Sequence, residues 1–198
     1  MGADAHPLRR ARAPLGAEHR QAAHELNLAA TLVLSQPEAA ASLHLLAEGE
    51  REVHPGGALV LGALLHLTGH AEACQFWLQF AAGGGNPTAA SCLALLHASR
   101  GEHRDAAFWR QQVDRLATQT SAPPRATDLP WAPLPDTLWT DTLARCHEGV
   151  ALRLPPRVAA VVHQLPVLGA DADLGDIPQP SPSLVRDLTR AAPSGRVR

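Results

Sequence analysis

The sequence lacks several residue types, and their absence narrows the classes of protein to which it can belong. Lysine and tyrosine are both absent, so all 17 basic residues are arginine. These 17 basic and 19 acidic side chains give a formal net charge of −2, without the positive excess typical of a nucleic-acid-binding surface. We interpret the abundance of Ala, Leu, Pro and Arg as the codon bias of a GC-rich bacterial genome, so arginine counts alone say little about function.

Cysteines and long apolar runs are also scarce. Cys74, Cys92 and Cys146 have the spacing of neither a zinc knuckle nor a redox pair, so we expect Cys74 and Cys92 to be buried thiols in a reducing compartment. Residues 1–16 lack the apolar run of a secretory signal, and the most apolar stretch, residues 57–67, is too short to span a bilayer. We therefore expect a cytoplasmic protein.

The clearest positive signal is an internal similarity with a period of 32 residues. Gly69 and Gly101 are 32 residues apart, and each separates two helix-like stretches. Trp77 and Trp109 have the same separation, which favours a packing role over a ligand groove. One further step back from Gly69 reaches Pro37, which also lies between two helix-like stretches. The sequence therefore predicts three units of helix, short turn and helix, the first of them degenerate.

Each unit needs neighbours, because a single helical hairpin cannot bury enough apolar surface to offset its chain entropy. The leucines of residues 58–67 lie nearly all round their helix, which predicts that this helix is central. Glycine and proline at the turns stop the preceding helices. Asn86 or Thr88 is suited to cap the helix that follows the glycine-rich break. The predicted fold is all-α, built from stacked antiparallel hairpins.

The second unit resembles a Sel1-like repeat. The resemblance rests on residues 73–82, which contain Trp77 and end in Ala81-Ala82, then on Gly85-Asn86, Ala89-Ala90 and Leu93-Ala94. The third unit repeats part of this pattern in residues 106–109, and Leu61-Gly62 with Gly69 also suits the related tetratricopeptide (TPR) pattern. The resemblance covers roughly residues 22–117. It implies a short α-solenoid whose concave face holds a peptide or a helix of a partner protein.

The composition also divides the chain into segments. The proline-rich stretch from about residue 119 ends the repeats, and we expect helices over residues 136–149 and 157–164 to cap the exposed end of the stack. Residues 181–188 have the pattern of a short docking helix, but the Asp-, Pro- and Ser-rich composition around them favours disorder. The expected segments are a flexible N-terminal tail (1–20), the repeat domain (21–118), a linker (119–135), a helical extension (136–168) and a mostly disordered tail (169–198).

Eleven histidines raise the possibility of metal chemistry. His66 and His70 have a spacing that suits two ligands on one helical face, but Gly69 interrupts it, and no glutamate follows His66 as in hydrolytic zinc motifs. His97 and His103 flank the next turn in a similar way. Histidines near the ends of helices are more often caps than ligands. The sequence contains neither a nucleophile motif nor a phosphate-binding loop, so we expect no cofactor, metal or enzymatic activity.

The remaining hypothesis is a surface that binds another protein. In stacks of this type the first helix of each hairpin lines the concave side, and helical spacing places six polar residues there: His24, Asn27, Thr31, His66, Thr88 and Ser91. We therefore expect a non-enzymatic interaction module, most simply a bacterial regulatory adaptor. Two alternatives stay open at this point: a small metal- or ligand-binding enzyme that uses the histidine-rich turns, and a nucleic-acid-associated regulator.

Overall fold

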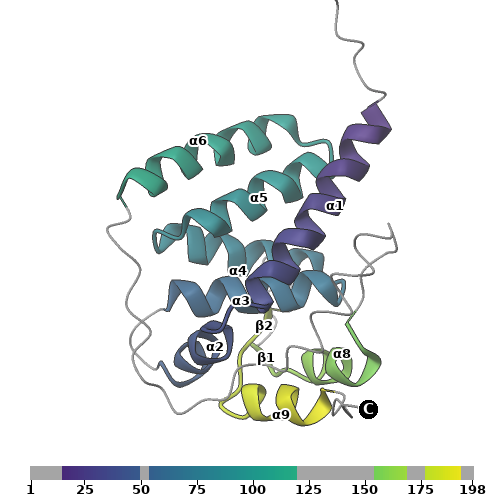
Figure 1. The fold of residues 1–198 in the computed structure, drawn as a ribbon, viewed down its shortest axis with the longest axis vertical. Helices are drawn as coiled ribbons and strands as arrows, with labels where there is room; N and C mark the ends of the chain where they lie inside the picture. The colour runs from purple at the N-terminus through teal and green to yellow at the C-terminus, as the bar shows by residue number, and fades with distance from the viewer. Residues whose placement is uncertain (1–14, 50–53, 120–153, 169–176, 193–198) are drawn as a thin grey trace, which may run out of the picture.

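The computed structural model describes residues 15–49, 54–119, 154–168 and 177–192, and over these residues the fold is all-α (Figure 1). A short antiparallel pair joins two strands, with Val167 opposite Pro178 and Leu168 opposite Ile177. The elements in chain order are α1 (Leu15–Leu34), α2 (Ala39–Glu48), α3 (Pro55–Leu67), α4 (Ala71–Gly83), α5 (Pro87–Ser99), α6 (His103–Gln119), α8 (Pro156–His163), β1 (Val167–Leu168), β2 (Ile177–Pro178) and α9 (Leu184–Ala191).

The turns between the repeat helices follow the local chemistry of their residues. Pro55 and Pro87 stand at the first positions of α3 and α5, where the missing N–H of proline costs nothing. The side chain of Asn86 accepts a hydrogen bond from Ala89 N at 3.0 Å, so the cap predicted there is confirmed. Gly69 and Gly101 end the first helix of their hairpins with φ angles of +86° and +79°, which a residue with a Cβ rarely adopts.

From α2 to α6 each helix packs against the next one along the chain, as the hairpin prediction requires. The central position expected for residues 58–67 is confirmed, because α3 buries nearly every side chain, including Leu61, Leu64 and Leu65. Leu93 of α5 and Leu78 of α4 continue the same core. Burying a leucine is worth roughly 1.5–3 kcal/mol, so these contacts account for much of the stability of the stack.

The first predicted unit departs from this scheme. Helix α1 packs mainly across α5 and α3, and its contact with α2 is minor at most. Figure 1 shows α1 running obliquely across the layers formed by α3 to α6. Leu26, Ala30 and Leu34 are among the buried side chains that hold α1 there. The expectation of a first antiparallel hairpin was therefore wrong, because the apolar face of α1 is buried against the central helices.

The C-terminal elements lie beside α2, α3 and α4, at the opposite end of the molecule from α6 (Figure 1). The short helix expected near residues 157–164 is confirmed as α8, whereas the helix expected over residues 136–149 and the linker 119–135 lie, apart from Gln119, outside the described residues. Helix α9 packs on α8 and α2, and β2 packs on α4. Trp77 Nε1 donates a buried hydrogen bond of 2.9 Å to the carbonyl oxygen of Pro178.

Two expected tails contain ordered structure. Helix α1 begins at Leu15, within the expected flexible segment 1–20. Residues 177–192 form β2 and α9, so the expectation of a mostly disordered C-terminal tail was wrong for this part. Leu184 and Leu188 of α9 are 1% and 2% exposed. Their burial offsets the loss of chain entropy on ordering, which the sequence analysis expected to keep this segment disordered.

Candidate functional site

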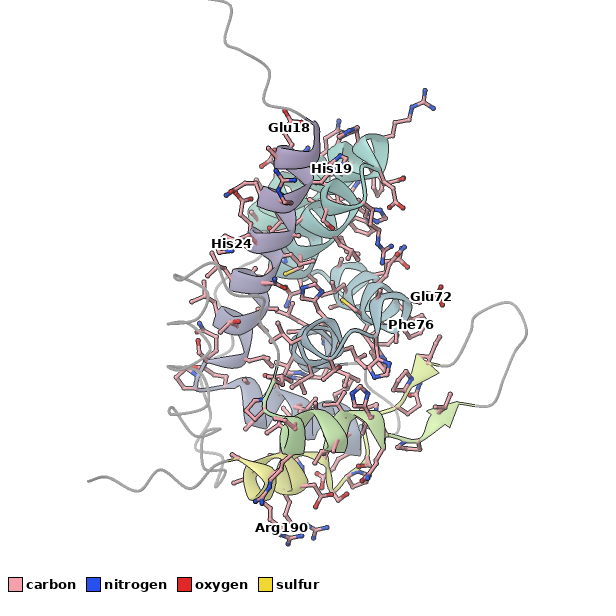
Figure 2. All side chains as sticks on the ribbon, turned by 90° about the vertical axis from the view of Figure 1, so that its right-hand side faces the viewer. Glu18, His19, His24, Glu72, Phe76 and Arg190 are labelled. Carbon is pink, nitrogen blue, oxygen red and sulfur yellow. The ribbon has the colours of Figure 1, made fainter. Side chains whose placement is uncertain are left out.

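The six predicted partner-binding residues are distributed over α1, α3 and α5. The side chains of two of them form hydrogen bonds within their own helices. Thr31 is fully buried, and its hydroxyl donates to the carbonyl oxygen of Asn27 at 2.9 Å. Ser91 Oγ donates in the same way to the carbonyl oxygen of Pro87 at 3.1 Å. These hydroxyls therefore stabilise their own helices and are poorly placed to contact a partner. His24 is half-exposed on α1 (Figure 2).

Asn27 and His66, two further residues of the predicted set, contact each other. His66 Nε2 lies 2.7 Å from Asn27 Oδ1. Because a carbonyl oxygen can only accept, the proton of the bond belongs to the imidazole. Burial, and secondarily the positive charge of Arg100, lower the pKa of His66 to about 4, so its ring is neutral at pH 7. The contact joins α1 to α3 and leaves both side chains only partly exposed.

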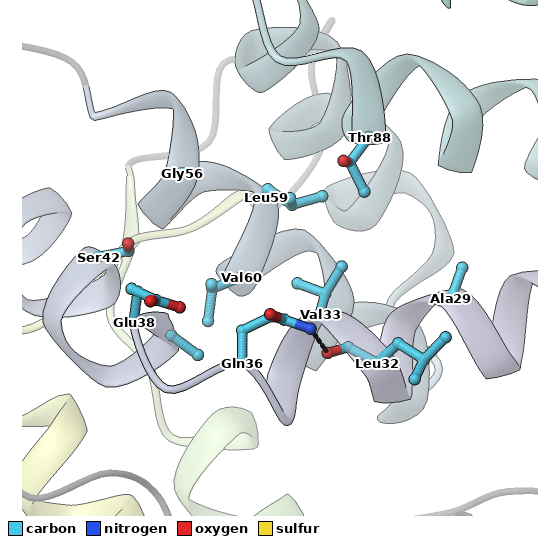
Figure 3. A pocket seen from close by; sticks show the side chains of 11 residues that line it. Ala29, Leu32, Val33, Gln36, Glu38, Ser42, Gly56, Leu59, Val60 and Thr88 are labelled. Atoms are coloured by element: carbon cyan, nitrogen blue, oxygen red, sulfur yellow. Dashed lines mark hydrogen bonds between the residues drawn. The ribbon is translucent and has the colours of Figure 1, made fainter. Parts of the chain in front are cut away.

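Helix α1 therefore covers part of the surface that the sequence assigned to a partner. The first helices of the two regular hairpins are α3 and α5, and α1 packs on both of them. A peptide that binds the part of α3 and α5 beneath α1 would have to displace this helix. One accessible surface is a groove beside the C-terminal half of α1, where this helix meets α2, α3 and the start of α5 (Figure 3).

This groove has a volume of about 440 Å³ and a mainly apolar lining. Leu59 and Val60 of α3 lie across from Val33 of α1, and Leu32, at 50% exposed, lies at its edge. Thr88 is the one predicted site residue among those that line it. The lining residues are Ala29, Leu32, Val33, Gln36, Glu38, Ala39, Ser42, Gly56, Leu59, Val60 and Thr88.

Three polar side chains from the α1–α2 connection and α2 give the groove a partly polar border. Gln36 Nε2 donates to the carbonyl oxygen of Leu32 at 3.2 Å, which closes the end of α1 (Figure 3). Glu38 is exposed and is the only acidic or basic side chain among the lining residues. Ser42 of α2 also lines the groove. The groove has an apolar floor and a single carboxylate, and its lining contains no pair of nucleophile and base. This composition suits binding better than catalysis.

Sequence reasoning missed the groove residues of α1 because it assigned α1 to a hairpin with α2. One available signal was the distribution of apolar residues over 28–34, which forms a surface too wide to be buried as a single packed face of the helix. Leu28 and Leu32 lie four residues apart, beside the face formed by Leu26, Ala30 and Leu34. Of these, Leu32 is the side chain that the structure leaves most exposed. An apolar residue left over after packing indicates a candidate contact surface.

The histidine pairs predicted as possible metal ligands are separated in the structure. His66 bonds Asn27, whereas His70 faces His163 of α8. His97 is 5% exposed, and its Nδ1 lies 2.5 Å from Glu102 Oε2. His103 instead lies beside His19, with ring centroids 5.8 Å apart.

One three-residue group in the described part of the chain has donors close enough to share an ion. The donor atoms of His97, Glu102 and Asp105 lie within 4.8 Å of one another. The bond between His97 and Glu102 already joins the end of α5 to the start of α6, so this group has a structural role without an ion. The buried thiols of Cys74 and Cys92 are poor ligands or nucleophiles, since burial raises both pKa values to about 12.

These features define an all-α protein of packed helices with an apolar groove. No family model matches the chain, and no curated protein or solved structure matches it either. Among the described helices none is long and apolar enough to cross a membrane.

Proposed function

We propose that this protein is a non-enzymatic protein–protein interaction module that holds a short apolar segment of a partner in the groove between α1, α2 and α3. The observation that carries the proposal is Leu32, a large apolar side chain left 50% exposed at the edge of a groove lined by Val33, Leu59 and Val60. Apolar anchors that enter such a groove supply most of the affinity of a small interface.

The size and charge of the groove indicate the chemistry of the partner. A volume of about 440 Å³ lies within the range of small binding sites and holds only a few side chains. Glu38 places one exposed carboxylate at the border. A partner segment with one or two large apolar residues followed by Lys or Arg fits both features, because the cation then lies against Glu38.

The resemblance of residues 73–94 to a Sel1-like repeat supports the same proposal, since repeats of this kind serve as scaffolds for partner recognition. A bacterial regulatory adaptor remains the simplest role for such a module. In this role α1 is part of the recognition surface, because its outer edge forms one wall of the groove while its inner face is held on α3 and α5.

The proposal is tested with peptides selected by display on the purified full-length protein. We expect enriched peptides to contain an apolar anchor next to a basic residue. Their binding, measured by fluorescence anisotropy, should be lost in Leu32→Glu and weakened in Glu38→Arg. A peptide whose basic residue is replaced by glutamate should recover affinity for Glu38→Arg, because the charge pair is then reversed.

The matched control is Phe108→Ala, which removes another exposed apolar side chain, at 51% exposed, from α6. This variant should bind the selected peptides as the wild-type protein does. Amide chemical-shift changes on peptide addition should centre on Leu32, Val60 and Thr88. Changes centred on α6, or binding lost equally in the Phe108 and Leu32 variants, would contradict the proposal.

A further inference from the structure

Two histidines that are far apart in the sequence face each other at the junction between the repeat helices and the C-terminal elements. His70 precedes α4 and His163 ends α8. His70 Nε2 lies 2.8 Å from His163 Nδ1, and the ring centroids are 4.8 Å apart with an angle of 57° between the rings. This is a contact between two nitrogens that are chemically alike, brought together by tertiary packing alone.

The contact leaves donor capacity for a ligand. In a neutral imidazole one nitrogen carries a proton and the other has a lone pair, so a direct bond between the rings uses one lone pair and one proton. His163 is exposed and His70 half-buried, so an ion from solvent can reach both. Neutral imidazoles that meet in this way are the usual ligands of divalent transition metals.

The separation of the two nitrogens also fits a metal ion. With metal–nitrogen bonds of about 2.0–2.1 Å, two nitrogens 2.8 Å apart subtend roughly 85–90° at the metal. A right angle is the angle between neighbouring ligands in square-planar and octahedral sites, whereas a tetrahedral zinc site needs a wider one. For both nitrogens to bind the ion, the ring that donates the proton of this N–H···N bond changes to its other tautomer. Small ring rotations then direct both lone pairs toward a common point.

We propose that His70 and His163 form a two-histidine site for a divalent ion that accepts ligands at right angles, Ni²⁺ or Cu²⁺, with water in the remaining positions. A cavity of about 430 Å³ adjoins His163 and leaves room for that water. Its lining combines Thr68 and Gly69, from the turn before His70, with Leu154, which precedes α8, and Pro156, the first residue of α8.

Charged and titratable residues near the site lie on α3, α4 and α5, and Glu72 stands in the first turn of α4. His66, at the end of α3, lies on the same cavity and is held by Asn27. Arg100, at the end of α5, donates to the carbonyl oxygen of Ala71 and to Gln75 Oε1, so its charge is directed to these oxygens. Among the described residues no carboxylate joins the two imidazoles in a group of three metal donors, and a pair of imidazoles selects borderline ions over Mg²⁺ or Ca²⁺.

Ion binding would cross-link two segments that are far apart in the sequence. An ion that binds both imidazoles joins the turn before α4 to the end of α8, and it stabilises the folded state because the unfolded chain does not hold the two rings together. The site lies at the opposite end of α3 from the peptide groove, since the groove contacts Gly56 and the site follows His66. Its test is therefore independent of the proposed peptide binding.

The test titrates Ni²⁺ into the metal-free full-length protein at pH 7.5 by calorimetry. We expect one site in the wild-type protein, a melting temperature that rises with Ni²⁺ concentration, and paramagnetic broadening centred on the amides of Ala71 and Gln164. His163→Ala removes one of the two ligands, so it should weaken this site by at least the roughly tenfold that the loss of a supporting partner of a ligand costs. His163→Gln should do the same, although glutamine still forms a hydrogen bond with His70.

The matched control is His24→Ala, which removes a half-exposed histidine from α1 and should leave the Ni²⁺ site unchanged. Equal Ni²⁺ affinity in the wild-type protein and both His163 variants would overturn the proposal and show that the two rings share only a proton. Broadening centred on His97 and Glu102 would overturn it as well, by placing the ion at the other turn.

Discussion

Asn27 Oδ1 accepts a hydrogen bond from His66 Nε2 at 2.7 Å, and this contact joins α1 to the central helix α3. The two residues lie 39 positions apart in the chain. Because the ring is mostly buried, the amide of Asn27 supplies the partner that water would otherwise provide. The position of α1 across α3 and α5 thus combines apolar burial with one specific polar contact.

Removing this contact should destabilise the protein. Asn27→Ala leaves the buried Nε2–H of His66 without its acceptor, and an unsatisfied buried donor costs about 1–3 kcal/mol. We expect the free energy of unfolding, measured with urea, to fall by that amount. His24→Ala, one helical turn away on α1, should change it by no more than about 0.5 kcal/mol. Equal effects of the two substitutions would show that the contact contributes nothing specific.

The same histidine predicts a dependence of stability on pH. The folded-state pKa of His66 is about 4, below the unfolded value of 6.5, so its neutral form is favoured by folding. Its contribution is fully present above pH 6.5, because the ring is then neutral in both states. It is lost progressively as the pH falls from 6.5 to about 4, where the unfolded chain takes up the proton first. The loss is on the order of 3 kcal/mol.

Urea unfolding at several values between pH 7.5 and pH 4 checks this prediction. His66→Gln has no group that titrates in this range, so it should show a shallower decline than the wild-type protein. His54 and His70, whose pKa values are also lowered by burial, should supply the part of the decline that remains in the variant. Parallel curves for the two proteins would assign the pH dependence to groups other than His66.

The close approach of α2 and α3 predicts a steric effect at Gly57. A Cβ at this position would lie 2.2 Å from the carbonyl oxygen of Ser42 and 2.6 Å from Leu46 Cβ, so the helices would have to separate. We expect Gly57→Ala to reduce the free energy of unfolding by about 1–3 kcal/mol. Gly83→Ala, in the last turn of α4, meets nothing within 4 Å and should be neutral or stabilising by up to about 1 kcal/mol. Thermal or urea unfolding compares the two, and a destabilised Gly83 variant would show that space is not the deciding factor.

The attachment of the C-terminal elements depends on Trp77. Trp77→Phe keeps most of the buried ring but leaves the carbonyl oxygen of Pro178 without its donor, at a cost of about 1–3 kcal/mol. We expect faster amide hydrogen exchange over residues 177–192 and little change in α5 and α6. Trp109→Phe, on α6 at the far end of the molecule, should leave exchange in residues 177–192 unaffected. Uniformly faster exchange across the whole chain in the Trp77 variant would contradict a local attachment.

The sequence alone determined the features that depend on neighbouring residues. Pro55, Gly69, Pro87 and Gly101 placed the helix ends, because proline suits the first turn and glycine accepts the positive φ of the reversal. The apolar residues all round the helix over 58–67 identified it as the central helix, because a helix without a polar face must be covered on every side.

Only the tertiary structure decided which surfaces meet. The apolar face of α1 is compatible both with a hairpin partner and with the central helices, and the larger apolar surface of α3 and α5 determined its position. Helix α9 has eight residues, too few to be stable alone, so it forms only because Leu184 and Leu188 are buried in the core that α2 and α8 share. The meeting of His70 with His163 and the groove beside Leu32 follow from these long-range contacts, which local sequence patterns do not contain.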